Sequence, residues 1–193
     1  MTTTTATVRS EITIVEGYRS REVASFLSQL DDQLARLRAA TRELTPADLQ
    51  WQPARGMNTI GMLLAHLAIV EVWWIKIGVL GEKDPDVRDV LGIGVDDDGL
   101  PIAADAEPFP FLNGKDLAFY DDLLDRARKN AKRLLATVTD EDLEKEVVRE
   151  RKDGTKRVLN GRWIYYHVLE HFAGHYGQIL LLTHMRNDAV KRA

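Results

Sequence analysis

The sequence predicts an all-α protein: a four-helix bundle with short extra helices and a small β-hairpin. Four long segments repeat apolar residues at intervals of three and four, the spacing of one face of an α-helix. An Asp-Gly pair at 153–154 lies between β-tolerant residues, as it does in a hairpin turn. The 193 residues, 45% of them hydrophobic, are enough to bury the core of one domain.

The N-terminal segment is rich in threonine, and we expect residues 1–15 to form a disordered or loosely packed tail. Residues 16–193 are expected to form one bundle domain. The start of the chain lacks the cationic residues and apolar run of a secretory signal. Because the sequence also contains no cysteine, we expect a cytoplasmic protein.

The first two long helices are predicted over residues 18–43 and 59–81. Asn58 or Thr59 would cap the second of them. Between the two, Thr45 followed by proline predicts the cap and the first residue of a short helix. The apolar stripes that define the long helices are Val23, Phe26, Leu27, Leu30, Leu34 and Leu37, and then Ile60, Leu63, Leu67, Val70, Trp74 and Ile77.

The long connection over residues 82–112 is acidic, contains four prolines and shows no helical period. A structureless connection of this length is uncommon in a compact domain, so we expect it to form a wall or lid of the functional pocket. Its run Asp96-Asp97-Asp98-Gly99 suggests a calcium loop. The aligned positions lack the Asp and Glu ligands of an EF-hand, and the run is therefore predicted to be a solvated loop.

The C-terminal half predicts two more long helices, over residues 114–137 and 161–186. Thr139 with Asp142 three positions later resembles a capping box and predicts a short helix. Residues 146–159 form the expected hairpin. Six basic residues surround it, for which a solvated edge is the favoured interpretation and an anion-binding rim the alternative: Arg149, Arg151, Lys152, Lys156, Arg157 and Arg162.

Composition and charge exclude several function classes. The net charge of −4 argues against a nucleic-acid partner, and the lack of cysteine excludes thiolate metal sites and cysteine nucleophiles. The apolar run 60–80 is long enough to cross a membrane. His66, Glu71 and Lys76 are spread around that helix, however, so a buried helix of a soluble bundle is the better interpretation and no membrane partner is expected.

The histidines are the strongest chemical signal. His171 and His175 are four residues apart on the apolar stripe of the last helix, so both imidazoles can face one ion. His66, among apolar residues of a facing helix, can supply a third ligand. Three histidines without cysteine suit Zn²⁺ or Ni²⁺ and leave a coordination position open, as in catalytic sites. The alternative is a set of hydrogen-bonded core histidines.

His167 leaves a second pairing open, because it is also four residues from His171. It lies eight residues from His175, or about 12 Å of helix rise, so all three cannot easily bind one ion. Whichever of His167 and His175 is not a ligand would lie near the pocket as a hydrogen-bond partner or a proton shuttle.

Two segments resemble the DinB/YfiT-like family of bacterial four-helix bundles: LTPADLQWQPARGMNTIGMLLAHLAIVEVWW at 44–74 and HVLEHFAGHYGQILLL at 167–182. The resemblance implies that His66, His171 and His175 are the metal ligands and that His167 is not. Gln178 matches the glutamine of the family's Gly-Gln pair, with a packing role or a contact to a ligand.

The resemblance also implies a function, because the family includes bacillithiol transferases and mycothiol-dependent isomerases and transferases. We expect a metal-dependent enzyme, a thiol-dependent S-transferase or a hydrolase, that acts on a small molecule as a homodimer. A low-molecular-weight thiol is the implied cofactor besides the metal, and His167 is the candidate catalytic residue for proton transfer. The alternatives are a non-catalytic metal-binding or stress-response bundle and a non-covalent haem bundle.

Overall fold

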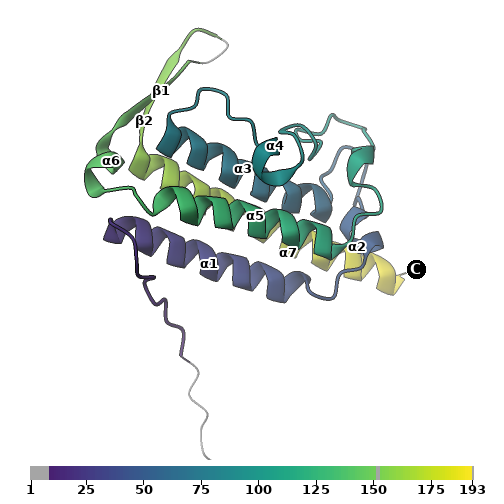
Figure 1. The fold of residues 1–193 in the computed structure, drawn as a ribbon. Coiled ribbons are helices and arrows are strands. Elements are labelled where there is room, and N and C mark those ends of the chain that lie inside the picture. Colours follow the sequence, from purple (N-terminus) through teal and green to yellow (C-terminus); the bar gives the residue numbers. More distant parts are fainter. Residues whose placement is uncertain (1–8, 151–152, 193) are drawn as a thin grey trace, which may run out of the picture.

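Four long helices lie side by side in the computed structural model, which describes residues 9–150 and 153–192 (Figure 1). They are α1 (Arg21–Thr41), α3 (Ile60–Leu80), α5 (Leu117–Leu135) and α7 (Gly161–Arg192). The predicted all-α fold with a small hairpin is thereby confirmed. Shorter elements join them: α2 (Pro46–Gln50), α4 (Arg88–Leu91), the 3-10 helix η1 (Pro110–Leu112) and α6 (Asp140–Glu144).

The helix boundaries follow from capping side chains. Thr59, rather than Asn58, caps α3 by accepting from the Met62 amide. Thr45 and Thr139 form complete capping boxes at α2 and α6. The last helix differs from its prediction, because α7 continues beyond residue 186 to Arg192.

The connection over residues 82–112 is not structureless, which corrects the prediction. It contains α4 and η1. Val87 and Leu91 are buried in the main core, and Gly92 ends α4 in the left-handed conformation. An element of four residues is too short to show a helical period, so hydrophobic spacing could not reveal it.

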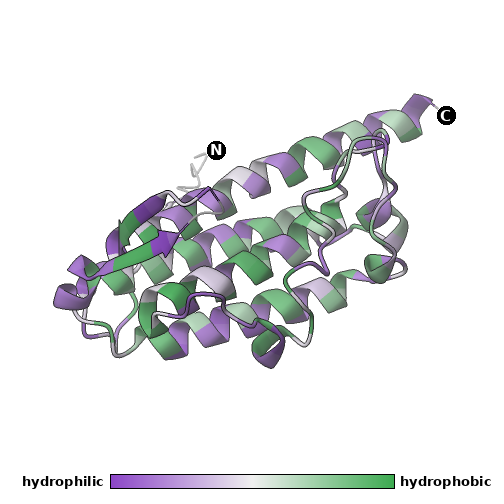
Figure 2. Ribbon diagram, turned by 90° about the horizontal axis from the view of Figure 1, so that it is seen from above, coloured by the Kyte–Doolittle hydropathy of each residue, from purple (hydrophilic) through white to green (hydrophobic). Residues whose placement is uncertain are grey.

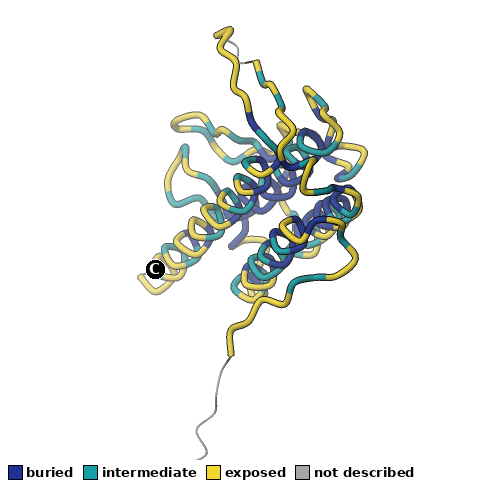
Figure 3. Tube along the Cα trace, turned by 90° about the vertical axis from the view of Figure 1, so that its left-hand side faces the viewer, coloured by how far each residue is buried: buried dark blue, intermediate teal, exposed yellow. Residues whose placement is uncertain are grey.

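Helix α3 is the central element of the core. It packs against α5 and α7, and most of its residues are buried, so hydrophobic residues occur all around it rather than on one stripe (Figures 2 and 3). By length and hydropathy alone this helix could cross a membrane. Its polar residues have partners within the bundle: Glu71 pairs with Arg128, and Lys76 pairs with Asp89.

The hairpin projects from the bundle beside α6 (Figure 1). Strand β1 (Glu146–Glu150) pairs antiparallel with β2 (Lys156–Asn160), and Arg149 lies opposite Arg157. Each of these two guanidinium groups lies over an indole ring, that of Trp73 for Arg149 and that of Trp163 for Arg157. The hairpin is thus attached to the ends of α3 and α7 that carry the tryptophans.

Candidate metal centre

Three histidines from two helices bring their ring nitrogens together. His66 comes from α3, and His171 and His175 come from α7. The Nε2 atom of His171 lies 3.2 Å from Nε2 of His66 and 3.0 Å from Nε2 of His175. One ligand atom from each ring lies within 4.8 Å of the others. We call these residues the histidine trio.

The trio lies at the edge of the core rather than inside it. The apolar stripe of α7 predicted core positions for His171 and His175, but both are half-buried. The buried positions on this part of α7 belong to Val168, Phe172 and Ile179. This correction matters for chemistry, since a site at the edge of the core can be reached by a ligand from solvent.

Hydrogen bonds on the outer nitrogens orient two of the rings. Nδ1 of His66 lies 2.8 Å from a carboxylate oxygen of Asp98, and Nδ1 of His175 lies 2.8 Å from the amide oxygen of Gln178. Because both oxygens are acceptors, each Nδ1 carries the proton and donates it. Each Nε2 therefore keeps its lone pair and presents it to the trio, the arrangement that metal-binding histidines use.

The prediction of a solvated loop at Asp96-Asp97-Asp98 is wrong for Asp98, which is 1% exposed. Its second carboxylate oxygen accepts from the Leu100 amide. Sequence reasoning missed this residue because three adjacent aspartates look alike, and its partner His66 is far away along the chain. Gln178, in contrast, was singled out by the resemblance, and it does contact a histidine of the trio.

Burial and neighbouring rings favour the uncharged form of the two trio histidines on α7. Burial, together with the neighbouring rings of His175 and His66, lowers the pKa of His171 to about 3. Burial also lowers the pKa of His175, although the hydrogen bond with Gln178 opposes the shift. Neutral imidazole is the form that binds a metal ion.

The donor set and its spacing fit a divalent metal ion. Nitrogens at about 2.1 Å from a tetrahedral ion lie about 3.4 Å apart, close to the distances found within the trio. The lone pairs of His66 and His175 both face His171, whose Nε2 has at most one proton to share between them. An ion would satisfy all three nitrogens at once, and the trio can therefore hold a metal.

His167 lies one turn before His171, outside the trio. Its ring stacks on Trp163 at 4.7 Å between centroids and meets the edge of Trp74 at 5.1 Å. Its Nδ1 lies 2.9 Å from a carboxylate oxygen of Glu170. The structure thus brings together His171 and His175 with His66, and it places His167 in an aromatic setting next to them.

The connection between α3 and α5 forms a wall beside the trio, as predicted. Leu100, Pro101 and Ile102 line a hollow of about 390 Å³ together with His66 and Asn58. The same connection supplies Asp98. The length of this connection predicted that it would line the functional pocket, and it does lie beside His66.

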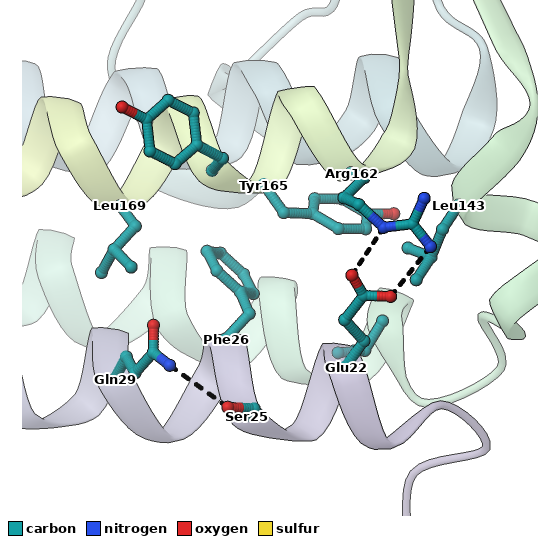
Figure 4. Close-up of a pocket in the computed structure, with 10 residues that line it drawn as sticks. Glu22, Ser25, Phe26, Gln29, Leu143, Arg162, Tyr165 and Leu169 are labelled. Atoms are coloured by element: carbon teal, nitrogen blue, oxygen red, sulfur yellow. Dashed lines mark hydrogen bonds and ion pairs between the residues drawn. The ribbon is translucent and has the colours of Figure 1, made fainter.

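The basic residues around the hairpin do not act as one group. Arg162 pairs with Glu144. It also pairs with Glu22 and borders an apolar hollow between α1 and α7 (Figure 4). Arg149 and Arg157 instead cover indole rings. Arg151 and Lys152 lie outside the described residues. Arg157 and Arg162 are nevertheless exposed, in agreement with the favoured interpretation as a solvated edge, whereas Arg149 is half-buried.

Comparison with known families gives a match over residues 25–184 to the family described as Mycothiol-S-transferase. The matched segment contains the whole trio together with Asp98, His167 and Gln178. No curated protein matches the chain.

Proposed function

Since this chain belongs to the mycothiol S-transferase family, within the DinB/YfiT-like group, we propose that it is a metal-dependent thiol S-transferase acting on a small molecule. The proposal assigns His66, His171 and His175 as the metal ligands and Zn²⁺ or Ni²⁺ as the ion. The convergence of three imidazoles at a half-buried site is the observation that carries it.

The histidine trio and the residues around it have different roles in the proposed reaction. Bound to the trio, a divalent ion would lower the pKa of a thiol and hold it as the nucleophilic thiolate. Asp98 and Gln178 fix the tautomers and directions of two ligands, which keeps the site in the binding geometry. Solvent access at the edge of the core leaves room for the thiol and for a second substrate.

His167 is the proposed catalytic residue for proton transfer. Its hydrogen bond with Glu170 holds the ring proton on Nδ1, which leaves a lone pair on Nε2 to accept the thiol proton. The stacked indole of Trp163 fixes the plane of the ring. The residue lies next to the trio, with 6.0 Å between its ring centroid and that of His171.

The family match favours S-transfer over the hydrolase alternative, because the matching family is described as Mycothiol-S-transferase. We further propose that the protein acts in the cytoplasm and as a homodimer. The resemblance to the DinB/YfiT-like family is the support for self-association. Light scattering coupled to size-exclusion chromatography would give the mass of the assembly.

The decisive experiment combines metal analysis with a conjugation assay. The full chain is loaded with Zn²⁺ or Ni²⁺, and mycothiol is offered with monobromobimane as the electrophile. We expect one bound ion, loss of conjugation on chelation, and recovery when the metal is returned. His167→Ala should keep the ion and lower kcat/KM about a hundredfold.

Two outcomes would overturn the proposal. A protein that binds metal but conjugates no thiol would support the non-catalytic alternative. Metal-dependent hydrolysis of an ester probe without any thiol would support the hydrolase. His184→Ala, an exposed histidine on the same helix, is the matched control and should leave both metal content and conjugation unchanged.

A further inference from the structure

A second hollow lies beside the histidine trio, with a volume of about 350 Å³. Apolar side chains from α7, from α3 and from the segment before α3 form most of its wall. They are Met57, Leu63, Leu181, Leu182 and Met185. Its size falls in the range of pockets that hold small molecules, and its wall has the mainly apolar character of such pockets.

Two polar residues connect this hollow to the trio. Gln178 lines it and hydrogen-bonds to His175. Asn58 lines it and also lines the hollow that contains His66. The hollow therefore adjoins the site through Gln178 of α7 and through Asn58 of the segment before α3, so that a molecule seated there would lie beside the trio.

The side chains that line the hollow disfavour a charged ligand. No ionisable side chain is among its described lining residues. The nearest cation on α7, Arg186, is paired with Asp48 of α2. A charged or polyhydroxylated group placed here would lose hydrogen bonds to water without replacement, whereas an apolar group would gain from burial. Methionines at two positions let the wall adapt to molecules of different shape.

Apolar surface is left open to solvent at this wall. Met57 is 40% exposed and Leu181 is 58% exposed. A single exposed apolar side chain is ordinary, but these two border one hollow beside a candidate reaction centre. A bound apolar group would cover both.

We propose that this hollow binds the apolar body of the electrophilic substrate, so that the enzyme acts on small uncharged molecules whose apolar part carries a carbon with a leaving group. The inference rests on the proposed S-transferase function. For an alkyl halide, the thiolate sulfur forms a C–S bond as the C–halogen bond breaks. The halide leaves with the bonding electron pair, and the proton of the thiol passes through His167 to solvent.

A chain-length series tests the inference. Mycothiol is conjugated with bromoethane, bromobutane and bromohexane by the metal-loaded protein. Burial of one methylene contributes about 0.8 kcal/mol, so kcat/KM should rise about fourfold for each added methylene until the hollow is filled. Leu181→Asp should remove this dependence. Leu180→Asp, an exposed neighbour outside the hollow, should keep the dependence.

A binding measurement separates this inference from the proposed function. The uncharged dye N-phenyl-1-naphthylamine should bind to the wild type, to His171→Ala and to Leu180→Asp, but at least tenfold more weakly to Leu181→Asp. Conjugation that is independent of chain length, or dye binding equal in all variants, would overturn the apolar hollow while S-transfer stands. Dye binding with no conjugation of any bromide would overturn S-transfer and keep the hollow as a site for apolar ligands.

Discussion

Helix α3 takes part in two polar clusters that differ in how their hydrogen-bonding groups are satisfied. In the first, the carboxylate of Glu71 accepts two bonds from Arg128, at 2.9 and 3.2 Å, and Arg128 also donates to Asp31. Glu71 is 1% exposed and Arg128 is 4% exposed. The second cluster is the histidine trio, where the inner nitrogens face only one another.

The difference separates a structural cluster from a functional one. Burial lowers the pKa of Arg128, but Glu71 and Asp31 outweigh burial and raise it, so the guanidinium stays charged. In the trio, burial and the neighbouring histidine rings lower the pKa of His171 and keep it neutral. Its Nε2 cannot satisfy both of the nitrogens that face it. A buried polar group whose hydrogen-bonding partners complement it indicates a structural role. A set of acceptor atoms that face one another without enough donors indicates a ligand-binding site.

The largest effect is expected from breaking the complete cluster. Arg128→Met leaves the Glu71 carboxylate buried without a partner and should lower the free energy of unfolding by about 3–5 kcal/mol, measured by urea denaturation. Arg36→Met, which removes an exposed pair with Asp32, should cost less than about 1 kcal/mol. Equal losses in the two variants would contradict the structural role of the Glu71–Arg128 pair.

The trio should respond to metal rather than to the loss of one side chain. An ion that binds only the folded chain stabilises it by about 2.7 kcal/mol when its free concentration is a hundred times the Kd. Chelation should lower the Tm of the wild type and leave the Tm of His171→Ala unchanged. A chelator effect that persists in His171→Ala would show that the ion binds elsewhere.

Loss of the contact between Asp98 and His66 should weaken metal binding moderately but not abolish it. Asp98→Asn keeps the shape but weakens the acceptor that orients the ring, and metal affinity should fall about 10- to 100-fold. Competition with a chromophoric chelator measures the change. Asp96→Asn, an exposed aspartate in the same run, serves as the control and should bind metal like the wild type.

The smallest effect is expected in the pH dependence of the stability of the metal-free protein. The pKa of His171 is about 3 in the folded chain and 6.5 in its ordinary state. Between these values the unfolded chain binds a proton that the folded chain does not, so stability should fall as pH decreases from 6.5 towards 3. The urea midpoint at pH 7.5 and at pH 5 should therefore differ less in His171→Gln than in the wild type.

Sequence reasoning found what repeats locally and missed what depends on distant partners. The helices and the capping threonines follow from spacings of three or four residues. The same spacing left His167 and His175 as alternative partners of His171, and the family resemblance selected His175. The half-burial of the trio and the role of Asp98 depend on how α7 and the long connection pack against α3. No spacing in the sequence encodes these contacts, since their partners are tens of residues away.

Asp98 reaches His66 from the connection between α4 and η1, not from one of the long helices. Two residues later the same connection begins to line the hollow beside His66. A molecule in that hollow therefore touches the segment that orients a metal ligand. Thermodynamic linkage makes such an effect reciprocal, so occupancy of the hollow and metal loading would alter each other's affinity by the same factor. The dissociation constant for either one is then defined only at a stated concentration of the other.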